Sequence, residues 1–218
     1  MREIFHGELE RLGSDLATMC GLVRAAMEHA TKALVDTDLA LAEQVITDTQ
    51  QVYQLGEQCA DNASALLALQ APVARDLRVV VTGIRAAEKI GRMGDLARHI
   101  AEVVRLRHPN PVAPEELIAK LARMGQLAAE AAQRVEDSIA APSDVLSASL
   151  ERADDETDRL QREVVDLVSH ADPPYPVQVG VDVALLARFF ERFADQAVAI
   201  TRRLDYVITG ELPDRPVS

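Results

Sequence analysis

The chain has 218 residues, of which 48% are hydrophobic and only 3% aromatic, and it contains no Trp. Its formal net charge of −12 makes nucleic acid and anionic membrane surfaces unfavourable direct partners, because like charges repel. No stretch reaches the roughly 18 uncharged apolar residues that a membrane span needs, so we expect no direct membrane insertion. The first residues, Met1 to His6, are typical of a helix start and not of a signal peptide, and we expect a cytoplasmic protein.

Apolar residues recur at three- and four-residue spacing through most of the chain, which predicts long amphipathic helices. The first helix is expected over residues 3–35, and the residues Asp36 to Asp38 offer caps for the next helix. Pro72 suits the first turn of the third helix, and Gly210 is expected to end the sixth. The remaining helices are predicted at residues 39–69, from Pro72 to Arg107, and at 115–140, 145–170 and 177–209.

Cys20 and Cys59 are the only cysteines. Neither belongs to a C-x-x-C pair, and both fall within helical apolar patterns. We therefore expect buried free thiols and neither a disulfide nor a zinc site.

The second half of the chain repeats the first, at an offset of one hundred residues in the last helix of each half. The spacing Arg92-x-x-Asp95, with an Ile five positions later, recurs at Arg192-x-x-Asp195. A segment rich in Pro, at residues 108–114, separates the halves. The repeat predicts an all-α fold of two pseudo-symmetric three-helix bundles, with domains at 1–108 and 109–218.

Acidic residues interrupt the helical apolar stripes of the second half. Glu191 and Asp195 stand one turn apart on a stripe that also carries Val181 and Leu185, which predicts burial of these acids. The preceding helix carries a second such pair, Asp154 and Asp158. If the two helices are neighbours, four carboxylates face one another and repel, and a divalent or trivalent cation relieves that repulsion. The alternative is a structural ion-pair network with Arg188 and Arg192.

The first half has lost most of this pattern. Thr49 and Tyr53 stand where the second half has its first acidic pair, and Gly91 replaces a Glu. Asp95 persists, with Glu88 and His99 on its stripe as weaker candidate ligands. We expect this half to bind no metal or to bind it poorly.

A catalytic set is missing from the sequence. No Glu-x-x-His pair of the di-iron type occurs, the five histidines are scattered, and no glycine-rich phosphate loop is present. We therefore expect no enzymatic activity and no catalytic residue.

The two Arg-x-x-Asp helices, the run from Leu69 to Arg78 and the Asp154–Asp158 pair make the chain resemble the PhoU family. The resemblance covers about residues 3–211 and implies duplicated three-helix bundles. It also implies Glu/Asp-x-x-x-Asp motifs that bind metal clusters in some members. Here two motifs are intact, at Asp154/Asp158 and Glu191/Asp195, and two are broken, at Thr49/Tyr53 and Gly91/Asp95.

The resemblance further implies a negative regulator of the phosphate-starvation response. Such proteins act by contact between the ATPase subunit of a phosphate ABC transporter and a sensor histidine kinase, and they are commonly homodimers. The cofactor implied is an iron, zinc, manganese or magnesium ion in the second bundle. Two alternatives remain open: a metal-dependent enzyme or metal store, and a purely structural helical module.

Overall fold

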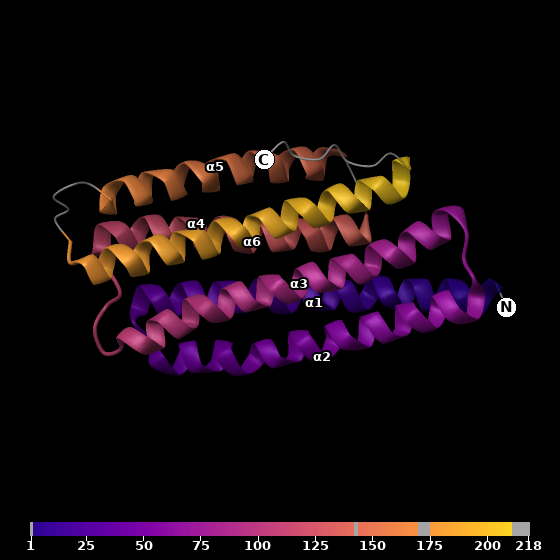
Figure 1. Cartoon of the computed structure of the whole chain (residues 1–218), viewed down its shortest axis with the longest axis horizontal. Helices are drawn as coiled ribbons and strands as arrows, with labels where there is room; N and C mark the ends of the chain where they lie inside the picture. The colour runs from indigo at the N-terminus through magenta and orange to yellow at the C-terminus, as the bar shows by residue number, and fades with distance from the viewer. Residues whose placement is uncertain (1, 142–143, 170–174, 211–218) are drawn as a thin grey trace.

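The computed structural model describes the backbone of residues 2–141, 144–169 and 175–210, and this part of the chain contains six helices and no strand (Figure 1). The predicted all-α class and the six long helices are thereby confirmed. His170, at the end of the helix predicted over 145–170, and residues 211–218 of the predicted second domain lie outside the described residues. The helices are α1 (Arg2–Asp36), α2 (Leu39–Gln70), α3 (Ala74–Arg107), α4 (Glu115–Ala140), α5 (Asp144–Val168) and α6 (Val177–Thr209).

The helix ends follow the expected capping chemistry, except that α3 begins later than predicted. The side chain of Asp38 accepts a 3.0 Å hydrogen bond from the backbone N–H of Leu41 and so caps α2. Gly210 adopts a left-handed φ of 76° and ends α6, as predicted, with its N–H bonded to the Tyr206 carbonyl. Pro72, which was predicted inside the first turn of α3, lies before that helix, because α3 begins at Ala74.

Four helices form the centre of the molecule and two lie outside them. Contacts join α1 to α3 and α4, and α6 to α3 and α4, while α2 packs on α1 and α3 and α5 packs on α4 and α6. Figure 1 shows α2 and α5 on opposite outer sides of this central group. The contact between α1 and α4 is as extensive as those within either half. One core therefore runs through both halves, and the division into two domains at residue 108 stays a prediction.

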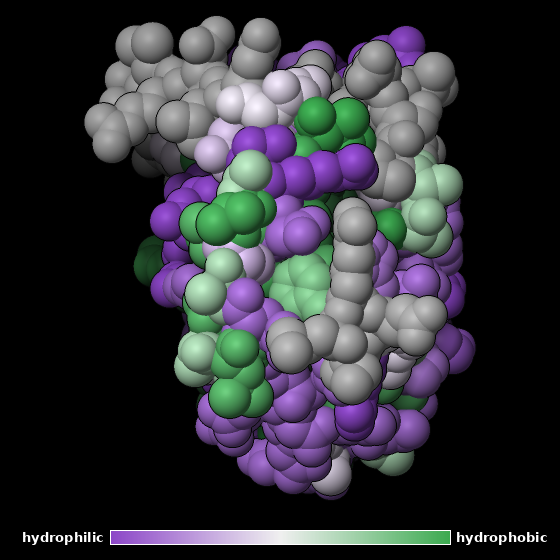
Figure 2. All heavy atoms as spheres, turned by 90° about the vertical axis from the view of Figure 1, so that its right-hand side faces the viewer, coloured by the Kyte–Doolittle hydropathy of each residue, from purple (hydrophilic) through white to green (hydrophobic). Residues whose placement is uncertain are grey.

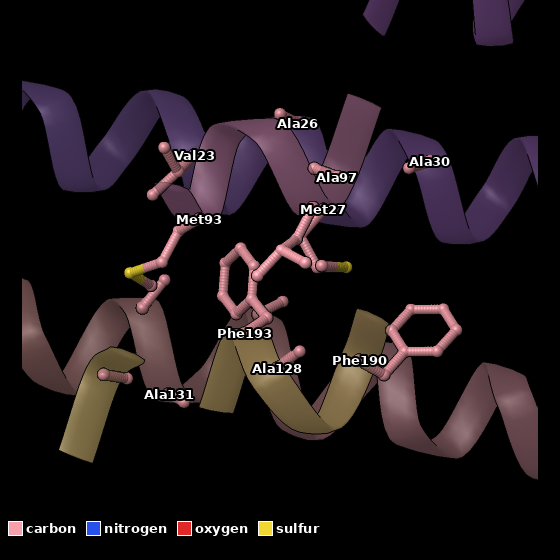
Figure 3. Packing of buried hydrophobic residues seen from close by; sticks show 14 of the residues in the cluster. Val23, Ala26, Met27, Ala30, Met93, Ala97, Ala128, Ala131, Phe190 and Phe193 are labelled. Atoms are coloured by element: carbon pink, nitrogen blue, oxygen red, sulfur yellow. The ribbon is translucent and has the colours of Figure 1, made fainter. Parts of the chain in front are cut away.

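The core is built from a few large side chains among many small ones. Phe190 and Phe193 are fully buried, and Figure 3 shows Phe193 among Met93 of α3 and Met27 of α1. Burying a side chain of this size contributes roughly 1.5–3 kcal/mol. Small residues line the facing helices, including Ala26, Ala97, Ala128 and Ala131, and they let the backbones approach closely.

The two halves approach closely at Gly125 of α4. A Cβ atom built there would come within 2.5 Å of Cγ2 of Thr31 on α1. A larger residue at position 125 would therefore force Thr31 or one of the two helices to shift.

A buried ion pair joins α3 to α6 across the halves. The guanidinium of Arg107 binds both oxygens of Asp182 at 2.6 and 2.9 Å. Asp182 is only 5% exposed, so loss of this bidentate partner would leave a buried carboxylate without its ion pair. No pattern in the sequence indicates this pair, which connects the end of α3 to the beginning of α6.

Both cysteines are free and buried, as predicted. Burial raises the pKa of the Cys59 thiol to about 11 and raises that of Cys20 further. Both thiols therefore stay protonated at neutral pH, and they serve as apolar core groups.

The end of the molecule at which α1 begins is shown in Figure 2. Hydrophilic side chains cover most of the coloured surface there, with apolar ones scattered among them. At this end an apolar pocket of about 530 Å³ lies between α1, α3, α4 and α6, with Leu12, Val79 and Ile208 in its lining. Among the described helices, none combines the length and the apolar character that crossing a bilayer requires.

Candidate carboxylate cluster and basic pocket

The four predicted carboxylates of the second half lie on two neighbouring helices. Asp154 and Asp158 project from α5, and Glu191 and Asp195 project from α6, which packs along α5. Burial, followed by repulsion from Asp195 and Asp158, raises the pKa of Asp154 to about 6. The structure thus brings the two pairs within electrostatic reach of each other.

The pKa values of Glu191 and Asp195 in this carboxylate cluster are shifted in the same direction. Burial and the charge of Asp195 raise the pKa of Glu191. Partial desolvation and the charge of Asp158 raise the pKa of Asp195. Asp154, Glu191 and Asp195 are therefore harder to ionise than in water, and a cation placed among them would reverse that effect.

Two carboxylate oxygens in the cluster have no hydrogen-bond partner although they are buried. They are Oδ1 of Asp154 and Oε2 of Glu191. Unpaired buried carboxylate oxygens are costly, and they are the donor atoms that hard cations prefer. The residues present therefore fit a cation site by their chemistry. Within the described residues, however, no three acidic, imidazole or thiol groups converge in an arrangement ready to hold a metal ion.

The ion-pair alternative is realised at one of the four acids. Arg188 donates a hydrogen bond to Oε1 of Glu191, whose side chain is 13% exposed. Arg192 lies near Asp195 and lowers its pKa, which opposes the effect of burial. These arginines offset part of the negative charge and leave the second oxygen of Glu191 unpaired.

The stripe that carries these acids is less buried than the spacing predicted. Val181 and Leu185, which precede the acids on α6, are 53% and 46% exposed. Asp158 and Asp195 are exposed, and only Asp154 and Glu191 are partly buried. The prediction of a buried stripe is thus wrong, because it follows the rim of the α5–α6 contact and not the core.

The first half satisfies its remaining acid with protein groups. Tyr53 donates a hydrogen bond to Oδ1 of Asp95, and Arg98 forms an ion pair with the same oxygen at 3.3 Å. The Thr49 hydroxyl is buried and bonds to the carbonyl of Ile46 in its own helix. The Tyr that replaces an acid in this half therefore becomes a partner of Asp95.

The two weaker candidates do not join Asp95. Glu88 is exposed and pairs with Arg92 at 3.1 Å. The ring of His99 lies against Phe189 of α6, with centroids 5.3 Å apart. Nε2 of His99 also lies 3.4 Å from Nη2 of Arg98, the ion-pair partner of Asp95, so an arginine and not a metal ion connects these two residues.

A second charged feature lies between α3 and α6 and was missed by the sequence analysis. It is a pocket of about 520 Å³, here called the basic pocket. The α3 residues that line it stand at helical spacing, which was a usable signal, but the α6 residues join them only through the tertiary packing. The lining consists of Arg85, Glu88, Lys89, Arg92, Gln196 and Arg203.

The six helices form a repeated arrangement, in which the second half keeps an acidic cluster and the first half has lost most of it. The chain is therefore a duplicated helical-bundle protein. Comparison with known proteins identifies its family. The model of the PhoU domain matches residues 16–104 and 121–204. The chain belongs to the PhoU family.

Similar proteins match along nearly the whole chain. The Mycobacterium tuberculosis protein "Phosphate-specific transport system accessory protein PhoU homolog 2" is 41% identical over 98% of this chain and all of its own length. The crystal structure of the phosphate transport system regulatory protein PhoU from Streptococcus pneumoniae superposes with a TM-score of 0.87 at 26% identity, covering 97% of this chain and all of that one. The crystal structure of PhoU from Pseudomonas aeruginosa gives a TM-score of 0.83 at 25% identity, covering 95% of this chain and all of that one.

Proposed function

We propose that this protein is a cytoplasmic accessory regulator of phosphate uptake and of the phosphate-starvation response. The observation that carries the proposal is family membership over nearly the full length, together with a relative named as an accessory protein of phosphate-specific transport. The protein acts by contact with the ATPase subunit of a phosphate ABC transporter and with a sensor histidine kinase. Its effect is negative: it restrains the response when phosphate is plentiful. It works as a homodimer and without catalysis.

An exposed apolar row on α6 supports a role in protein contact. Val177, Val181 and Leu185 follow one another at one-turn spacing and are 82%, 53% and 46% exposed. Adjacent exposed apolar side chains on a helix are suited to packing against another protein. The net charge of −12 favours partners with basic surfaces, chiefly through the rate of association.

The carboxylate cluster holds a divalent or trivalent cation in this proposal, with iron, zinc, manganese and magnesium as candidates. Asp154, Asp158, Glu191 and Asp195 supply the oxygens, and the ion offsets the repulsion among them. The pairing of Asp95 with Tyr53 and Arg98 supports weak or no binding in the first half.

Deletion of the gene tests the regulatory role. Genes of phosphate uptake should be expressed in phosphate-rich medium in the deletion strain, and the tagged protein should capture the ATPase subunit or the kinase. Normal repression in a strain lacking every PhoU homologue would refute the role. Hydrolysis of a phosphate ester that disappears in Asp158→Ala would instead establish the enzyme alternative.

Elemental analysis of the native protein tests the cation. We expect bound metal in the wild type, its loss in Asp158→Ala, and its retention in Asp95→Ala, the matched variant of the first half. Equal metal content in Asp158→Ala and the wild type would refute the assignment. Many ions per chain would favour a metal store.

A further inference from the structure

We propose that the basic pocket between α3 and α6 binds a phosphate oxyanion. The identity of the anion as a phosphate rests on the proposed function, whereas the existence of an anion site rests on the geometry alone. The pocket lies on the face of α6 next to the carboxylate cluster but uses other residues.

Positive charge is concentrated here in a chain that is otherwise strongly acidic. Four of the six lining residues are cations, against a single acid, although the chain carries 35 acidic and only 23 basic residues. Two of the cations, Arg85 and Arg203, form no ion pair or hydrogen bond with another residue in the part of the chain that the structure describes. Arg92 is paired with Glu88, which leaves the pocket with a net positive charge.

Lys89, one of the lining residues, shows the effect of this crowding. Lys89 donates a 3.2 Å hydrogen bond to Oε1 of Gln196 on α6. Burial, followed by repulsion from Arg203, lowers the pKa of Lys89. An oxyanion bound among these groups would remove the repulsion and accept the hydrogen bonds that the guanidinium groups have to donate.

The internal repeat indicates that packing does not require these cations. The positions equivalent to Arg85 and Lys89, one hundred residues later, are Leu185 and Phe189. Arg203 corresponds in the same way to Val103 of the first half. The fold thus accommodates apolar side chains at the places equivalent to Arg85, Lys89 and Arg203, whereas Arg92 is matched by Arg192.

The lining also limits the kind of anion. Guanidinium groups offer paired donors that match the oxygens of phosphate, and the ammonium group of Lys89 adds a point charge. None of the six lining residues is aromatic or aliphatic, so the pocket offers no surface on which a nucleobase could stack. These features favour inorganic phosphate, either free orthophosphate or a condensed phosphate, over a nucleotide.

Isothermal titration calorimetry on the purified full chain in chelator tests the site. Orthophosphate, tripolyphosphate and sulfate are titrated separately into the wild type and into Arg85→Gln/Arg203→Gln. We expect one phosphate site per chain and a weakening of at least about tenfold in the double variant, because each lost guanidinium removes a charge-assisted hydrogen bond. The matched control is Arg11→Gln/Arg105→Gln, which removes the same charge at two exposed arginines outside the pocket.

Each outcome decides the proposal. Tighter binding of orthophosphate or of tripolyphosphate supports it and identifies the free or the condensed form as the ligand. Absence of binding, equal weakening in the control, or equally tight binding of sulfate overturns it. The calorimetry is independent of the deletion experiment. The protein can therefore prove to be a regulator that has no anion site, or to have an anion site but no regulatory role, and the two experiments distinguish these cases.

Discussion

Replacement of Asp154 by Asn should stabilise the folded protein at neutral pH in the absence of divalent ions. The pKa of Asp154 rises from 3.8 to about 6 on folding, first because the side chain is buried and then because Asp195 and Asp158 are negative. A carboxyl group that is harder to ionise when folded destabilises the folded state once it is charged. Asn keeps the shape of the side chain, carries no charge and can donate hydrogen bonds to neighbouring acids.

The size and pH window of the effect follow from that shift. A difference of about 2 units corresponds to about 3 kcal/mol without screening by water, and the partial exposure of Asp154 reduces this to about 1–2 kcal/mol. The penalty is absent below pH 3.8, develops as pH rises toward 6, and is complete above it. Asp154→Asn should therefore raise the free energy of unfolding at pH 7.5 and leave it nearly unchanged at pH 3.5.

Urea unfolding of both proteins in chelator, at several pH values, measures this difference. The matched control is Asp61→Asn, an exposed acid on α2, for which we expect a change within about 0.5 kcal/mol. With saturating divalent metal the order should reverse, because the wild type gains a bound ligand that the variant has lost. The reasoning is refuted if Asp154→Asn lowers the free energy of unfolding at pH 7.5 in chelator. It is also refuted if the variant raises the free energy of unfolding as much at pH 3.5 as at pH 7.5.

Two further substitutions test the packing and the first-half site. Gly125→Ala should destabilise the protein by about 1–3 kcal/mol, because the added Cβ collides with Thr31. Its control is Gly21→Ala, whose Cβ meets no neighbouring atom and which should stabilise the protein by about 0.5–1 kcal/mol. Equal melting temperatures for the two variants would contradict the close crossing of α1 and α4. Tyr53→Phe should cost about 0.5–1.5 kcal/mol in urea unfolding through loss of the hydrogen bond to Asp95, and no change at all would show that this bond is not formed in solution.

Features that depend on neighbours along the chain were predictable from the sequence. The helices, the Asp38 cap and the Gly210 stop follow from side-chain periodicity and local backbone chemistry. The one-turn spacing of Glu191 and Asp195 places both on one helix face wherever that helix packs. The repeat also indicated which half keeps its acids, since Tyr53 and Gly91 stand at the equivalent positions.

Features that depend on which helices meet were decided only by the tertiary structure. Periodicity shows that a stripe exists but not how deeply it is covered, so the rim position of Val181 and Leu185 was missed. The bond between Asp182 and Arg107, and the meeting of Arg85 with Arg203, join residues 75 or more positions apart, and no local pattern encodes such distances. These residue pairs meet because the apolar faces of the two halves are buried against each other, with α1 packed on α4 and α3 packed on α6.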